Sequence, residues 1–265
     1  FSSGEVARFL GVSDGYLRQL SLDGLGPAPA LSAGGRRSYT PAQIGDLRAF
    51  LAAQRPKEAL SFLPRRRPGE KLQIVAVANF KGGSAKTTTA LYLAQFLALE
   101  GYRVLAIDLD PQASLSAMFG YQPEFDIGEG ETLYGAIRYD EERRPMREVI
   151  RQTYFAGVSL APGNLELMEF EHQTPRAMAE RGLRGGEIFF RRVATAIAEV
   201  EDDYDVVVID CPPQLGYLTM GALNAATALL VTVHPQMVDV ASMSQFLLMT
   251  SDVMSVIEEA GGRLD

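Results

Sequence analysis

A short run of small and basic residues, Lys81–Thr88 (KGGSAKTT), constrains the fold of this chain more than any other feature. It follows the almost continuously apolar stretch Leu72–Ala78, typical of a parallel strand covered on both faces. A helical pattern over Ala90–Glu100 comes soon after it. A strand, a glycine-rich loop and a helix in this order favour phosphate binding, because backbone N–H groups and the positive end of the helix dipole converge there. In such a loop Lys86 would reach the β- and γ-phosphates of a nucleotide, and the Thr87 hydroxyl would bind Mg²⁺.

Strand and helix patterns alternate through the rest of the chain. Four further stretches are expected to be strands: Val104–Ile107, Val158–Ala161, Asp205–Ile209 and Ala228–Val233. This alternation predicts an α/β fold with a mostly parallel, twisted sheet flanked by helices. We expect the domain to occupy residues 72–265.

Two aspartates lie where predicted strands end. Asp110 follows the strand that ends at Ile107 and comes 24 residues after Lys86, whereas Asp210 directly follows Ile209. Each aspartate alone could be a solvated strand end. Open α/β sheets bind ligands at the carboxyl ends of their strands, so both are candidates for the same site as the loop.

The loop departs from the ordinary pattern G-x-x-x-x-G-K-[ST], because Phe80 and Ala85 occupy the two glycine positions. The pattern that fits, K-G-G-x-x-K-T-T, resembles the deviant loop of the ParA/MinD class of P-loop ATPases. The sequence from Ala78 to Thr88 is most similar to that of the RepA proteins of RepABC-type plasmids. Alanine is small and stands here at the start of a helix, so we expect nucleotide binding to survive at Ala85. The alternative for the whole loop is a glycine-rich turn without a ligand.

The resemblance implies ATP or ADP with Mg²⁺ as ligands. The nucleotide-binding residues that it implies are Lys81, Gly82, Gly83, Ser84, Ala85, Lys86, Thr87 and Thr88. Among these, Thr88 would bind the α-phosphate. Lys81 would contact phosphate held in a second subunit, so that a homodimer encloses two ATP molecules and adds positive charge to the transition state, as an arginine finger does.

The two aspartates also match motifs of this class. Asp110 resembles the second aspartate of the D-x-D-P-Q segment, which helps to orient the attacking water. Asp210 resembles the Walker B aspartate, which holds a water bound to Mg²⁺. The implied catalytic residues are therefore Lys81, Lys86 and Asp110, and the metal would be held by Thr87 and, through water, by Asp210.

Residues 1–54 are predicted to form a separate small helical domain. Capping-box patterns at Ser2–Glu5 and Thr40–Gln43 predict two helix starts, and a further helix is expected from Ser13. The segment Val6–Ser13 resembles the helix–turn–helix of MerR-type winged domains, and Arg36–Thr40 resembles their basic wing followed by a helix. The alternative is a plain α-helical dimerisation module.

The resemblance to a winged helix–turn–helix implies DNA contacts for four residues. The second helix of such a motif enters the major groove, so Arg18 and Gln19 would face base edges. Arg36 and Arg37 of the wing would contact phosphate.

The charge distribution agrees with nucleic acid bound at one end. Residues 1–71 hold 11 Lys and Arg against 6 Asp and Glu, whereas the remainder holds 14 against 27. Uneven surface decoration is the alternative interpretation. Residues 55–71 contain three prolines and the run Arg65–Arg67, so we interpret them as a basic interdomain linker.

Composition excludes several other classes of protein. Cys211 is the only cysteine, which rules out an intrachain disulfide and a cluster held by four cysteines, and fits a reducing cytoplasm. The longest apolar run, near Ala225–Val233, is far shorter than the roughly 20 residues that span a bilayer. The chain starts at Phe1 rather than at a methionine, and we expect it to be part of a longer protein. The family's last strands, much of its adenine contact and its non-specific DNA-binding residues would lie beyond residue 265.

Together these resemblances imply a slow Mg²⁺-dependent ATPase that partitions plasmid DNA in the bacterial cytoplasm, in association with the nucleoid. Its partners would be operator DNA, non-specific DNA and a centromere-binding adaptor of the ParB/RepB type that stimulates hydrolysis. It would also repress its own operon, and no membrane partner is expected.

Three alternatives from other classes stay open. A MinD-like positioning ATPase would need an amphipathic carboxyl-terminal helix, a metabolic ligase or synthetase would need a substrate pocket, and a transcriptional repressor that only senses nucleotide would not depend on Asp110.

Overall fold

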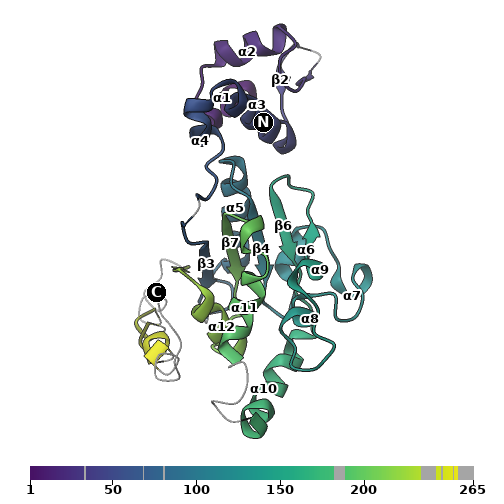
Figure 1. Cartoon of the computed structure of the whole chain (residues 1–265), viewed down its shortest axis with the longest axis vertical. Helices are drawn as coiled ribbons and strands as arrows, with labels where there is room; N and C mark the ends of the chain where they lie inside the picture. The colour runs from purple at the N-terminus through teal and green to yellow at the C-terminus, as the bar shows by residue number, and fades with distance from the viewer. Residues whose placement is uncertain are drawn as a thin grey trace.

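The computed structural model describes residues 1–32, 34–67, 69–79, 81–181, 189–233, 243–245, 247–252 and 254–255. In this part of the chain, a group of short amino-terminal helices lies at one end of a larger α/β body (Figure 1). No helix among these residues is long and apolar enough to cross a bilayer.

The α/β body is built on a six-stranded sheet with the order β5-β6-β4-β7-β3-β8. Its strands are β3 (Gln73–Ala78), β4 (Val104–Asp108), β5 (Arg151–Gln152), β6 (Val158–Ala161), β7 (Val206–Asp210) and β8 (Ala228–Val231). All neighbouring strands are parallel except the edge pair β5–β6. The mostly parallel sheet predicted from the sequence is thus confirmed, and the five predicted strands are present with ends shifted by two residues or fewer.

Helices cover both faces of this sheet, and side chains alternate between two apolar clusters along each central strand. In β7, for example, Val206 and Val208 join the cluster under α5, whereas Val207 and Ile209 join the cluster on the opposite face. The helices of the α/β body are α5 (Lys86–Leu99), α6 (Ser114–Met118), α7 (Pro123–Asp126), α8 (Leu133–Ile137), α9 (Met146–Val149), α10 (Leu167–Arg181), α11 (Arg192–Ala198) and α12 (Tyr217–Ala225), with 3-10 turns η2 (Phe189–Arg191) and η3 (Glu201–Asp203). Because α5 begins at Lys86 rather than at Ala90, the helix starts within the glycine-rich loop.

The amino-terminal group contains three helices and a two-stranded antiparallel hairpin. Its elements are α1 (Ser3–Leu10), α2 (Asp14–Leu22), β1 (Ala30–Leu31), β2 (Arg37–Ser38) and α3 (Pro41–Gln54). Both predicted capping boxes are formed, at Ser2 with Glu5 and at Thr40 with Gln43.

The segment interpreted as a linker carries structure and is anchored to the body. It includes η1 (Pro56–Glu58) and α4 (Ala59–Phe62), and Phe62 is buried in the cluster that also contains α5. Further along, the buried carboxylate of Asp205 accepts hydrogen bonds from the backbone N–H of Arg66 at 3.0 Å and from Arg103. Burial alone would raise the pKa of Asp205, but the hydrogen bonds from Arg103 and Arg66 hold it well below its usual value.

Arg48 of α3 connects the amino-terminal helices to the far end of α5. Its side chain is 1% exposed and donates to the carbonyl oxygens of Phe9 at 2.6 Å, Phe62 at 3.1 Å and Leu99 at 2.7 Å. It also forms an ion pair with Glu100 at 3.6 Å. The helix that begins in the glycine-rich loop therefore ends against α3.

Candidate nucleotide site

The loop between β3 and α5 provides no side-chain cap for the first turn of α5. Ala85 is the residue that precedes α5, and no side chain caps the helix there. The first N–H groups of a helix have no partner within the helix, and they carry the positive end of its dipole. This open end lies at the carboxyl edge of the sheet, so it offers donors to an anion such as a phosphate.

Ala85 adopts the left-handed conformation, with φ of 64°. Only glycine adopts this region without a penalty, and the cost for an alanine is about 1–2 kcal/mol. The loop therefore holds Ala85 in a strained backbone conformation at the start of α5.

We expect Ala85→Gly to raise the free energy of unfolding by about 0.5–1 kcal/mol, because relief of the strain exceeds the extra entropy of glycine in the unfolded chain. Urea denaturation followed by circular dichroism measures the change. Ala49→Gly, at an exposed position in the interior of α3, is the matched control and should lower stability by about 1 kcal/mol. Equal losses in the two variants would contradict a strained loop.

The Lys86 side chain folds back across the loop. Its ammonium group donates to the carbonyl oxygen of Lys81 at 3.3 Å, and the residue is 7% exposed. Burial lowers the pKa of Lys86, while the nearby carboxylates of Asp210 and Asp110 oppose that shift. A buried cation held next to open helix N–H groups provides positive charge where phosphate oxygens would lie.

Two residues that the sequence interpretation missed brace the loop from the ends of strands. Asn79, after β3, accepts from the N–H of Lys81 at 3.0 Å and donates to the carbonyl of Thr232 at 2.5 Å. Thr232, after β8, donates its hydroxyl to Ser84 at 3.0 Å. Asn79 could have been predicted from the sequence because it adjoins the loop motif. The contact of Thr232 could not, because it depends on the pairing of β3 with β8.

Asp210 lies beside the loop with both carboxylate oxygens buried and without a hydrogen-bond partner among the described residues. Burial, followed by repulsion from Asp108, raises the pKa of Asp210 to about 7, while the neighbouring Thr87 side chain lowers it. Asp108 and Asp210 occupy paired positions in β4 and β7, which brings the two carboxyl groups together.

These residues fit Mg²⁺ bound together with a nucleotide. The metal prefers oxygen ligands, keeps several waters, and usually takes only one or two protein groups besides substrate phosphates. An unpartnered buried carboxylate on Asp210 and the adjacent hydroxyl of Thr87 supply that limited set.

Asp110 stands on the turn after β4. One of its carboxylate oxygens accepts the N–H of Gln112 at 2.9 Å. Asp110 also lines a cavity of about 270 Å³, together with residues of its own turn, of α10, of the segment after β7 and of α12: Pro111, Gln112, Met168, Glu171, His172, Pro212, Pro213, Gln214 and Leu218. The structure thus places Asp110 on the lining of a cavity beside the carboxyl edge of the sheet.

The four predicted DNA-contacting residues lie far from this site, in the amino-terminal group. Arg18 and Gln19 are exposed on α2, with the Gln19 amide bound to Asp23 at 2.7 Å. Arg36 is exposed beside β2, and the guanidinium of Arg37 donates to Ser21 of α2 at 3.2 Å. The hairpin is therefore tied to the helix that carries Arg18 and Gln19.

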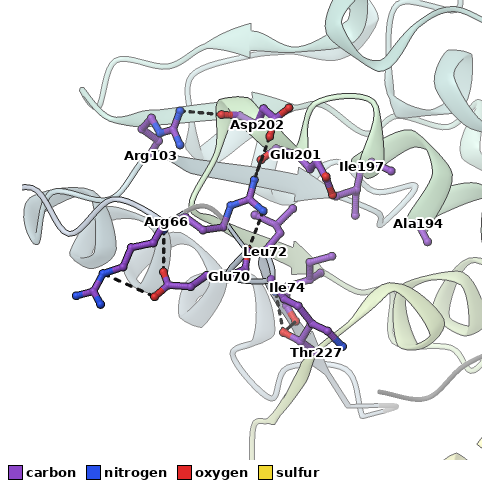
Figure 2. A pocket seen from close by; sticks show the side chains of 14 residues that line it. Arg66, Glu70, Leu72, Ile74, Arg103, Ala194, Ile197, Glu201, Asp202 and Thr227 are labelled. Carbon is purple, nitrogen blue, oxygen red and sulfur yellow. Dashed lines mark hydrogen bonds and ion pairs between the residues drawn. The ribbon is translucent and has the colours of Figure 1, made fainter.

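A separate hollow of about 670 Å³ opens at the amino-terminal edge of the sheet, opposite the loop (Figure 2). Its arginines are already engaged: Arg66 donates to the carbonyl of Glu201 at 2.6 Å and Arg103 to that of Asp202 at 2.9 Å. We assign no ligand to this hollow.

Comparison with known proteins gives matches across the whole chain. Residues 72–260 match the AAA_31 family model, described as an AAA domain. The protein named "Putative replication protein A" from Sinorhizobium fredii (strain NBRC 101917 / NGR234) is 54% identical over 265 residues, which are 100% of this chain and 65% of that protein. Protein SopA from Escherichia coli (strain K12) is 31% identical over 263 residues, covering 97% of this chain and 64% of SopA. The chain thus spans less than two thirds of the length of these two relatives.

A solved structure shares the fold of the α/β body. Cobyrinic acid a,c-diamide synthase from Mycobacterium smegmatis, with bound ADP and magnesium, superposes with a TM-score of 0.61 at 32% identity. The match covers 70% of this chain and 69% of that one.

Proposed function

Because the chain belongs to the ParA family of P-loop partition ATPases, we propose that it is an ATP-driven switch that acts in plasmid partition. The observation that carries this proposal is the meeting of an open helix end at Ala85 with the unpartnered buried carboxylate of Asp210. In a complex with a metal-bound polyphosphate, the helix end would bind the phosphate and the carboxylate would bind the metal ion.

The residues of the loop would hold ATP and promote its hydrolysis. N–H groups of residues 82–88 would bind phosphate oxygens, and Lys86 would neutralise charge on the β- and γ-phosphates. Thr87 and Asp210 would hold Mg²⁺, which supplies charge neutralisation when bound. Asp110, which lines a cavity, would orient the attacking water. Hydrolysis is slow in this proposal, because a switch must keep its ATP state until a partner arrives.

Lys81 would make the active form a dimer. It is partly exposed at the start of the loop, and its backbone N–H donates to Asn79. We assign its side chain to phosphate bound in the second subunit, where it would stabilise transition-state charge as an arginine finger does.

The amino-terminal group would bind DNA as a winged helix–turn–helix. Three helices, a hairpin after α2 and the link from Arg37 to Ser21 support this assignment. Arg18 would read base edges, and Gln19 would do so after exchanging its bond with Asp23. Arg36 and Arg37 would contact phosphates of an operator, through which the protein would repress its own operon.

The remaining partners are assigned through the family. A centromere-binding adaptor of the ParB/RepB type would stimulate hydrolysis and reset the switch. The ATP-bound dimer would also bind non-specific DNA, so the protein would associate with the nucleoid in the cytoplasm.

A nucleotide-sensing repressor without a role in partition is the second candidate, and the presence of the amino-terminal group favours it. A metabolic synthetase is less favoured, although one solved neighbour bears that name. That neighbour matches 70% of this chain, whereas the Sinorhizobium relative matches all of it, including the amino-terminal group.

The test measures oligomeric state and DNA binding without nucleotide, with ADP and with ATP, for the parent chain and for Lys81→Ala and Asp110→Ala. We expect ATP to produce a dimer in the parent and in Asp110→Ala, and Lys81→Ala to stay monomeric with ATP hydrolysis reduced on the order of 100-fold. Lys57→Ala, at a lysine outside the loop, is the control. If ATP changed neither oligomeric state nor DNA binding of the parent, the proposed switch would be wrong.

A further inference from the structure

We propose that Asp108, Ser116 and Gly163 form a clamp that positions Asp110 for ATP hydrolysis, which makes them positioning residues of the site. This inference rests on the proposed function, because it assigns the geometry on which the role of Asp110 depends. None of the three was singled out by the sequence interpretation.

The carboxylate of Asp108 is fully buried at the end of β4 and joins two segments. One oxygen accepts the backbone N–H of Asp110 at 3.3 Å. The other accepts both the N–H and the hydroxyl of Ser116, each at 2.7 Å. Because Ser116 belongs to α6, this carboxylate fixes both the start of the turn that carries Asp110 and the helix that follows it.

Ser116 extends the connection to a third segment. Its hydroxyl oxygen accepts the N–H of Gly163 at 3.1 Å, in the connection between β6 and α10. Both the serine and the aspartate are 0% exposed. Hydrogen bonds in a buried network of this kind are worth more than at the surface, and loss of one member leaves others unpaired.

Gly163 closes the clamp by its lack of a side chain. A Cβ atom at this position would lie 2.6 Å from the carbonyl oxygen of Asp108 and 3.0 Å from that of Asp110. Both atoms belong to the backbone, so they cannot move aside without moving the turn. The connection after β6 thus packs directly against the backbone of Asp108 and Asp110, which determines the position of the Asp110 side chain.

The turn itself leaves little freedom for Asp110 once the clamp is in place. The carbonyl of Asp110 accepts the N–H of Ala113 at 2.9 Å, and its carboxylate accepts the N–H of Gln112. At the other end, the N–H of Leu109 donates to the carbonyl of Asp210 at 3.0 Å, which joins the turn to β7. A shift at Gly163 would therefore change where Asp110 points without breaking the phosphate loop.

The experiment compares ATP turnover with binding of a fluorescent ATP analogue in four variants of the chain. We expect Gly163→Ala to lower kcat on the order of 100-fold, since misplacing a catalytic group by about 1 Å has that effect. Ser116→Ala should lower kcat roughly 10-fold, because Asp108 keeps the backbone bond from Ser116. Ser116→Thr restores the hydroxyl and should recover turnover. Affinity for the analogue should stay within about 3-fold of the parent throughout, since the phosphate loop is untouched.

Gly45→Ala is the matched control, because a Cβ there meets no atom within 4 Å, and it should behave as the parent does. The clamp is refuted if Gly163→Ala and Ser116→Ala turn over at the parental rate, or if analogue affinity falls in step with kcat. The same conclusion follows if Ser116→Thr stays as slow as Ser116→Ala. A parent chain that neither binds the analogue nor hydrolyses ATP would instead refute the proposed function.

Discussion

Replacing Arg48 by methionine is expected to lower the free energy of unfolding by about 3–5 kcal/mol, the cost of breaking a buried, charged hydrogen-bond network. The substitution keeps an unbranched apolar side chain in place of the arginine stem and removes the guanidinium group. It leaves the carbonyl groups of Phe9, Phe62 and Leu99 without their donor and removes the ion pair with Glu100. Burial lowers the pKa of Arg48, and the negative charge of Glu100 opposes that effect. The ion pair with Glu100 therefore helps to keep the buried guanidinium charged.

Urea denaturation with circular dichroism measures this loss. Arg18→Met, at an exposed arginine on α2, should change stability by less than about 0.5 kcal/mol. Because α1, α2, α3 and α5 contribute to one apolar cluster, the parent should unfold in one transition, and Arg48→Met should separate the amino-terminal helices into an earlier one. A change below about 1 kcal/mol in Arg48→Met would show that the buried arginine is dispensable.

Replacing Asp210 by asparagine is expected to stabilise the nucleotide-free protein while removing its activity. The native carboxyl group has a pKa of about 7, raised from its usual value chiefly by burial and then by Asp108. The folded protein therefore holds this proton more tightly than the unfolded chain does. Stability from this group is present at low pH and is lost as pH rises from about 4 through about 7.

Asparagine carries no charge and removes that loss, so Asp210→Asn should be more stable than the parent by about 1–3 kcal/mol at pH 8 and no more stable at pH 4. The proposed Mg²⁺-dependent ATP hydrolysis should fall on the order of 100-fold or more. Thermal unfolding at a series of pH values without nucleotide, with turnover measured separately, tests both parts. Asp46→Asn, at an exposed aspartate, controls for loss of negative charge. A variant that loses stability at pH 8 would show that Asp210 is paired in the native protein.

Local patterns allowed the sheet and the loop to be predicted from the sequence. Apolar runs gave the five main strands, and the small residues before Lys86 gave the start of the phosphate loop. The edge strand β5 was missed because two residues, Arg151 and Gln152, carry no periodicity. Helices α6 to α9 were missed for a similar reason, since each has only four or five residues.

Contacts between distant segments could not be predicted in this way. Asp108 lies two residues before a predicted site residue, but its bond to Ser116 depends on how α6 folds back on β4. Arg48 lies at helical spacing from the apolar residues Ile44 and Leu51, but its charge gave no reason to expect burial, which follows from the docking of α3 against Leu99. The prolines and arginines of residues 55–71 suggested an interdomain linker, but the hydrogen bonds from this segment to Asp205, about 140 positions away, could not be predicted from its composition.

The placement of α5 has a consequence for the energetics of the molecule. A helix of 14 residues is about 21 Å long, and this one has Lys86 at its first turn and the carbonyl bound by Arg48 at its last. Any movement of the helix along its axis is shared by both ends. If nucleotide changes the affinity of the protein for DNA by some factor, thermodynamic linkage requires that DNA change its affinity for nucleotide by the same factor. In the proposed switch, the coupling free energy between nucleotide and DNA would therefore be a single quantity, which titration of either ligand could measure.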